Sequence, residues 1–66
     1  PKWTRRADAR PDELAQAALE LCSERGVHAT RVADVAERAG VTVGTVYRYF
    51  RDKDALIEAA LRTAVG

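Results

Sequence analysis

Apolar side chains between Leu14 and Cys22 recur with the period of an α-helix. They fall at positions i, i+3, i+4, i+7 and i+8, on one stripe of the helix: Leu14, Ala17, Ala18, Leu21 and Cys22. Pro11 is tolerated in the opening turn of such a helix, and Gly26 supplies a left-handed cap after its last turn. The spacing therefore predicts a helix over residues 11–25 with one buried face.

Three shorter helices are predicted after the first. The second covers residues 32–39 and ends at Gly40. Thr42 can cap a third, very short helix that runs to about residue 50, and Asp52 can cap a fourth. Valine is frequent in this part of the chain, but it does not alternate with polar residues as it would in a strand. The predicted fold is therefore all-α, a three-helix bundle followed by the start of a fourth helix.

Length and composition exclude several classes of protein. A chain of 66 residues has room for one small domain. Its single cysteine excludes an internal disulfide framework and fits a reducing compartment. No apolar run approaches the ~18 residues of a membrane span. The sequence also lacks a Ser-His-Asp set, a paired carboxylate site, a phosphate loop and a metal-ligand cluster. We therefore expect no enzyme, no cofactor, no metal site and no membrane as partner.

Charge is unevenly distributed along the chain, although the net charge is only +1. Residues 1–10 carry an excess of +3, residues 11–39 a balance of −3, and residues 40–66 a balance of +1. The first ten residues form a basic arm that can follow a DNA backbone or remain a solvated tail. The predicted domain of three helices then covers residues 11–51, and the fourth helix begins in residues 52–66.

Residues 32–50 have the spacing of a homeodomain-like helix-turn-helix. Two helices of about two turns meet at Gly40-Val41-Thr42. Gly40 provides the positive φ needed to leave the first of them, and Val41 can fill the angle between the two. A helical hairpin with a glycine turn has the same spacing, so spacing alone leaves both a DNA-binding motif and a plain hairpin open.

A helical wheel gives the third helix two faces. The inward stripe consists of Val43, Val46, Tyr47 and Phe50. The outward face consists of Gly44, Thr45, Arg48 and Tyr49. Gly44 costs ~1 kcal/mol relative to alanine inside a helix, and close approach to the floor of a major groove is the simplest reason for it. Arg48 can bind phosphate or guanine, and Lys53 adds a cation at the next helix start.

One continuous pattern runs from Gly26 to Leu56. It consists of Gly26-Val27-His28-Ala29-Thr30, Val35-Ala36, Ala39-Gly40-Val41-Thr42, Gly44-Thr45-Val46-Tyr47-Arg48-Tyr49-Phe50, Asp52-Lys53 and Leu56. This pattern resembles the TetR family of bacterial transcription regulators, and the string Gly-Thr-Val-Tyr-x-Tyr-Phe-x-Asp-Lys is its most specific part. The resemblance implies a DNA-binding head whose third helix enters the major groove. By position it implies DNA contacts from Thr42, Val43, Gly44, Thr45, Tyr47, Arg48, Tyr49 and Lys53.

Two positions depart from the family pattern. Position 31, often Ser or Thr, is Arg31, which can reach a phosphate or a base while Thr30 takes over the cap; both are candidate DNA-binding residues. Position 43, often polar or basic, is Val43, which favours van der Waals contact with a thymine methyl group over a hydrogen bond. The resemblance thus implies that Val43 and Tyr47 contact DNA, whereas the helical wheel places both residues on the inward face.

For the whole protein, the resemblance implies a homodimeric repressor on an inverted-repeat operator in double-stranded DNA, in the bacterial cytoplasm at the nucleoid. It also implies a small-molecule inducer, bound by a C-terminal ligand-binding and dimerisation domain beyond residues 52–66. Two other functions stay open. One is a TetR-like head that organises the chromosome or acts in division. The other is a small helical protein-interaction module centred on Tyr47, Arg48 and Tyr49, whose complex would be insensitive to salt.

Overall fold

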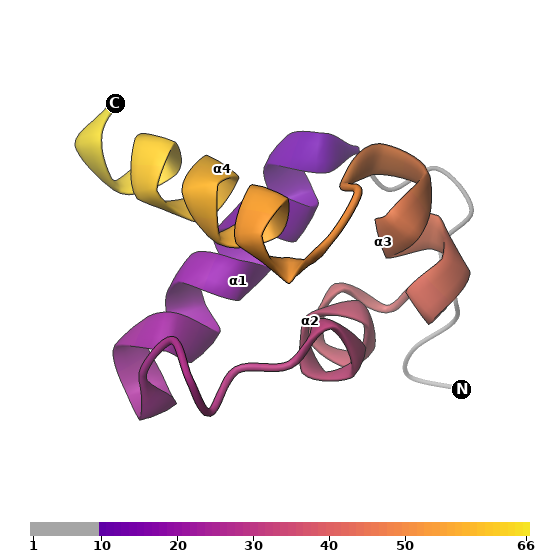
Figure 1. Ribbon diagram of the computed structural model, residues 1–66, viewed down its shortest axis with the longest axis horizontal. Coiled ribbons are helices and arrows are strands. Elements are labelled where there is room, and N and C mark those ends of the chain that lie inside the picture. Colours follow the sequence, from indigo (N-terminus) through magenta and orange to yellow (C-terminus); the bar gives the residue numbers. More distant parts are fainter. Residues whose placement is uncertain (1–9) are drawn as a thin grey trace.

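Four helices make up the part of the chain that the computed structural model describes, residues 10–66 (Figure 1). They are α1 (Pro11–Arg25), α2 (Val32–Ala39), α3 (Val43–Tyr49) and α4 (Lys53–Val65). These residues contain no strand, so the predicted all-α class and all four predicted helices are confirmed. The predicted basic arm lies outside the described residues except for Arg10.

Three of the predicted helix ends have the expected local chemistry. The Thr42 hydroxyl accepts the Thr45 N–H at 3.3 Å and caps α3. The Asp52 carboxylate accepts the Ala55 N–H at 2.9 Å and caps α4. Gly40 ends α2 in the left-handed region, with φ 78° and ψ 30°. Each cap satisfies backbone groups that a helix end leaves without a partner.

Gly26 ends α1 differently from the prediction. Its φ is 86°, but its ψ is 160°, so it does not adopt the left-handed helical conformation. This region is accessible essentially only to glycine, because any Cβ is strained there. The Gly26 carbonyl oxygen accepts a hydrogen bond from the Thr30 hydroxyl at 2.8 Å, which closes the turn between α1 and α2.

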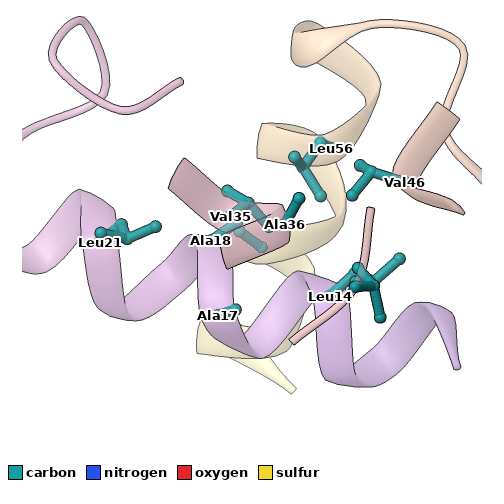
Figure 2. Packing of buried hydrophobic residues seen from close by; sticks show 10 residues of the cluster. Leu14, Ala17, Ala18, Leu21, Val35, Ala36, Val46 and Leu56 are labelled. Atoms are coloured by element: carbon teal, nitrogen blue, oxygen red, sulfur yellow. The ribbon is translucent and has the colours of Figure 1, made fainter. Parts of the chain in front are cut away.

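The core lies where α1 meets the other three helices (Figures 1 and 2). α1 packs most extensively against α4, which crosses it in Figure 1. The buried cluster consists of Leu14, Ala17, Ala18, Leu21, Val35, Ala36, Val41, Val46, Leu56 and Ala60. Since α4 contributes Leu56 and Ala60, the fourth helix belongs to the same packing unit as the first three.

Several predicted inward positions lie elsewhere. Val46 is buried and Phe50 is partly buried against the core, but Val43 and Tyr47 are exposed, so the wheel was wrong for these two residues. Only Val46 of α3 is fully buried, because this seven-residue helix touches the bundle along a narrow stripe. Cys22 is only half-buried and lies outside the core cluster.

None of the helices within residues 10–66 combines the length and the apolar character that crossing a bilayer requires.

Candidate nucleic-acid interface

The turn between α2 and α3 is held by backbone hydrogen bonds and by one buried side chain. The Gly40 N–H donates to the Glu37 carbonyl oxygen at 3.2 Å, and the Val41 N–H donates to that of Ala36 at 2.9 Å. The Val41 side chain is buried in the core cluster, as predicted. The angle between the two helices is therefore fixed by the core itself.

α3 presents an unusual outer surface. Val43 is 39% exposed, Tyr47 50% and Tyr49 40%, and Gly44 and Arg48 are exposed as well. Val43 and Tyr47 are four residues apart, as are Gly44 and Arg48, so each pair is adjacent on the helix surface. α3 contains no acidic residue. We call the surface formed by Thr42, Val43, Gly44, Thr45, Tyr47, Arg48 and Tyr49 the α3 face.

Gly44 has no structural role inside the domain. Its backbone is helical, and a Cβ added there would meet only the Thr42 hydroxyl oxygen, at 3.9 Å. The core therefore gives no steric reason for a residue that lowers helix stability. The missing side chain instead leaves the start of α3 open to the outside.

The start of α3 is ordered by two hydroxyl groups. The Thr42 and Thr45 side-chain oxygens lie 3.1 Å apart, in addition to the Thr42 cap. Thr42 is exposed and Thr45 is half-buried. Each hydroxyl group has one hydrogen, and the bond between the two uses one of them, so the pair retains one hydrogen that can be donated to a ligand.

Three cations among the predicted DNA-binding residues take part in no ion pair within residues 10–66: Arg31, Arg48 and Lys53. Arg31 is exposed at the N-cap position of α2, and Lys53 is half-buried in the first turn of α4. Other arginines are paired, for example Arg25 with Asp34 at 3.3 Å. Cations without an acidic partner keep their full charge available for phosphate groups.

Thr30 does not take the place that the sequence suggested. It is only 1% exposed, and its hydroxyl bonds to the Gly26 carbonyl oxygen rather than capping α2. The N-cap of α2 is Arg31, and the Asp34 carboxylate accepts the Arg31 N–H at 3.2 Å. The prediction that Thr30 caps α2 is therefore wrong, and its hydroxyl is buried with a partner inside the domain.

Two features were missed by sequence reasoning. Arg51, next to the α3 face in sequence, has a side chain that is 90% exposed and lies 3.5 Å from the Asp52 carboxylate. Its spacing of three residues from Arg48 was the available signal. The second feature is the pairing of Glu24 of α1 with Arg38 of α2.

Arg38 of α2 forms an ion pair with Glu24 near the end of α1. Hydrogen bonding from Arg38 holds the pKa of the Glu24 carboxyl below its ordinary value, and the same pair raises the pKa of Arg38. The Arg25–Asp34 pair joins the same two helices near the start of α2. These exposed pairs support the orientation of the helix-turn-helix on its outer side.

Comparisons with known proteins agree with this geometry. The family model described as "Bacterial regulatory proteins, tetR family" matches residues 14–60. The HTH-type transcriptional regulator BetI of Escherichia coli is 46% identical over 50 residues, which are 76% of this chain and 26% of that protein. The solved structure of the fatty acid degradation regulator FadR from Bacillus halodurans superposes with a TM-score of 0.79 at 29% identity, over 94% of this chain and 33% of that one.

The chain thus spans about a quarter of BetI and a third of FadR. The family match covers most of α1, all of α2 and α3, and the first part of α4. Because the match includes the helix-turn-helix and the core that holds it, the chain belongs to the TetR family of bacterial regulatory proteins.

Proposed function

We propose that this chain is the DNA-binding head of a TetR-family transcriptional repressor, with the α3 face as its DNA surface. The observation that carries the proposal is the combination on one short helix of exposed aromatic side chains, an exposed arginine without an acidic partner among the described residues, and a glycine that the core does not require. A major groove is wide enough to admit one helix, and its walls are phosphates.

Each part of the α3 face has a distinct role in this proposal. Val43, Gly44 and Arg48 face base edges on the floor of the groove. Tyr47 and Tyr49 donate hydrogen bonds from their hydroxyl groups to phosphates. One of Thr42 and Thr45 does the same, namely the residue whose hydrogen is not used in the bond between the two hydroxyl groups. Lys53 and Arg31 bind phosphates on either side, from the starts of α4 and α2. Phosphate contacts set the position of α3, and base contacts set the preferred sequence.

The whole protein is proposed to act as a homodimer on an inverted repeat, in the bacterial cytoplasm. Two heads related by a two-fold axis recognise two half-sites in opposite orientation. A small-molecule inducer bound outside this chain releases the DNA by changing the spacing of the heads. The family membership and the share of each relative that this chain leaves uncovered support this extension.

The test is selection from randomised duplex DNA at low and moderate salt, with the chain held as a dimer by a fused coiled coil. Enrichment of an inverted repeat whose binding weakens with salt is the expected result. Salt-sensitive binding without enrichment would favour a chromosome-organising role instead. No binding at either salt would contradict DNA binding and favour a protein-interaction module.

Three variants separate the proposed roles. Tyr47→Phe should weaken binding to all sequences alike. Arg48→Ala should relax the preference at one or two base pairs by ~1–3 kcal/mol each. Lys53→Ala should lower the slope of log affinity against log salt by about one. Arg62→Ala is the matched control, because this arginine is paired with Glu58 on α4 and lies outside the proposed surface.

A further inference from the structure

We propose that Val43 makes DNA binding depend on the C5-methyl group of one pyrimidine in each half-site, so that 5-methylcytosine can replace thymine there. This inference rests on the proposed function and adds to it the chemical feature that is read. It also predicts that methylation of a cytosine at this position strengthens binding.

The first step is the surroundings of Val43. Its isopropyl group is 39% exposed, whereas Val46 on the same helix is 1% exposed and fills the core. A single exposed valine is ordinary on a protein surface. Here, however, the next residue is Gly44, where an added Cβ would have no contact closer than 3.9 Å. The apolar group therefore stands beside open space, and a flat surface can approach it.

The second step is the chemistry of the side chain. Valine has no hydrogen-bond donor or acceptor, so it cannot pair with the N7, O6, N6, O4 or N4 atoms that line a major groove. The remaining feature on a base edge is the methyl group at C5 of thymine. Cytosine carries hydrogen at C5, and 5-methylcytosine carries the same methyl group as thymine. An apolar contact does not distinguish these two methyl groups.

The third step is the rigidity of the contact. β-branched side chains have one strongly preferred rotamer in a helix, so Val43 presents its methyl groups in a fixed direction. The Thr42 cap and the adjacent Thr45 hydroxyl order the turn that carries Val43. Tyr47 lies one turn further along and covers the same side. When an apolar side chain is held in one position, its affinity for a base can depend on a single methyl group of that base.

The expected effect follows from the size of that group. Burying one methyl group in an apolar contact changes affinity by about fourfold. The measurement uses one half-site duplex and this chain, with fluorescence anisotropy at low salt. At each pyrimidine position, four bases are compared: thymine, deoxyuridine, cytosine and 5-methylcytosine. This set varies the methyl group separately from the hydrogen-bonding edge of the base.

At one position, we expect thymine to bind about fourfold more tightly than deoxyuridine, and 5-methylcytosine about fourfold more tightly than cytosine. Val43→Ala should move both ratios at that position toward one, because it removes most of the apolar contact. Because each ratio is taken within one variant, a loss of protein stability cancels. Val27→Ala is the matched control, since Val27 is 41% exposed but lies in the turn between α1 and α2; it should leave both ratios unchanged.

Two results would overturn the inference and leave the proposed function intact. One is salt-sensitive DNA binding without any position that responds to the methyl group. The other is a methyl dependence that persists unchanged in Val43→Ala. If the chain binds no duplex at any salt concentration, the proposed function itself fails, and this inference fails with it.

Discussion

Arg38 of α2 binds Glu24 of α1 through both ends of its guanidinium group. The Nη1 and Nη2 atoms lie 2.5 and 2.9 Å from the two carboxylate oxygens, across a separation of 14 residues. Nη1 also lies 3.7 Å from the Glu20 carboxylate. A bidentate pair has a defined geometry, so it orients one helix against the other as well as attracting it. α2 is the helix that carries the turn into α3, and the pair is thus connected to the proposed DNA surface.

Arg38→Met should lower the free energy of unfolding, and the loss should be smaller when Glu24 is already glutamine, with only the longer contact to Glu20 left to lose. The reason is that both substitutions remove the Arg38–Glu24 pair, so their effects are not additive. Urea unfolding followed by circular dichroism measures all four proteins of this cycle. Arg62→Met is the control, because Arg62 and its partner Glu58 lie on the same helix and are both more exposed than Arg38 and Glu24. Equal losses from Arg38→Met and Arg62→Met would contradict an orienting role for Arg38.

Acidification should weaken the fold through Glu24. The folded pKa of this carboxyl lies below its ordinary value of 4.5, because the charged form is hydrogen-bonded to Arg38. The stabilisation is therefore complete above the unfolded pKa and is lost as the pH falls through the folded pKa. Urea unfolding of the wild type and Glu24→Gln, repeated from neutral to acidic pH, measures this. The difference between the two proteins should shrink below about pH 4.5. A constant difference would show that the carboxyl is not charged preferentially in the folded state.

Leu56→Ala should cost about 2–5 kcal/mol, because it opens a cavity between α4 and α1. Leu56 is 1% exposed, whereas Leu61 on the same helix is 57% exposed. Leu61→Ala should therefore change stability by no more than about 0.5 kcal/mol. Chemical denaturation of both variants tests whether α4 belongs to the core. Similar costs for both would mean that the fourth helix is only a connector.

Gly40→Ala and Gly44→Ala should have effects of opposite sign on stability. Gly40 has a φ of 78°, where a Cβ costs about 1–2 kcal/mol, so Gly40→Ala should destabilise the domain. Gly44 is helical with open space around it, so Gly44→Ala should stabilise the domain by about 0.5–1 kcal/mol. The same Gly44→Ala should weaken DNA binding, because its new methyl group fills the approach to the groove. Thermal denaturation and DNA titration of both variants test this. Tighter DNA binding by Gly44→Ala would contradict the claim that Gly44 leaves space for α3 to approach the groove.

Asp52→Ala should cost about 1 kcal/mol through loss of the α4 cap, and Asp52→Ser should recover most of it. The Asp52 carboxylate accepts the Ala55 N–H, which otherwise has no helical partner. Asp54→Ala is the matched control, because Asp54 lies in the same first turn but does not cap it. The midpoints of urea unfolding compare the three variants. A larger loss from Asp54→Ala would mean that charge near the helix end, rather than the cap, is what stabilises α4.

The sequence by itself determined the helices and most of the core. Helix bounds follow from hydrogen bonds between residues three or four apart, and the signals for them are local: Thr42 and Asp52 as caps, Gly40 as a stop. The buried positions Leu14, Leu21 and Leu56 follow from the same periodicity. These features need no knowledge of how the helices cross.

Tertiary structure decided which side of each short helix meets the core. α3 has a single fully buried residue, Val46, so its rotation is set by contacts with α1 and α2 and not by its own pattern; this is why Val43 and Tyr47 are exposed. The burial of Thr30 and the pairing of Arg38 with Glu24, 14 residues away, were likewise decided by tertiary structure. The periodicity of a sequence identifies which residues share one face of a helix. Whether that face is buried or exposed is decided only when another part of the protein packs against the helix.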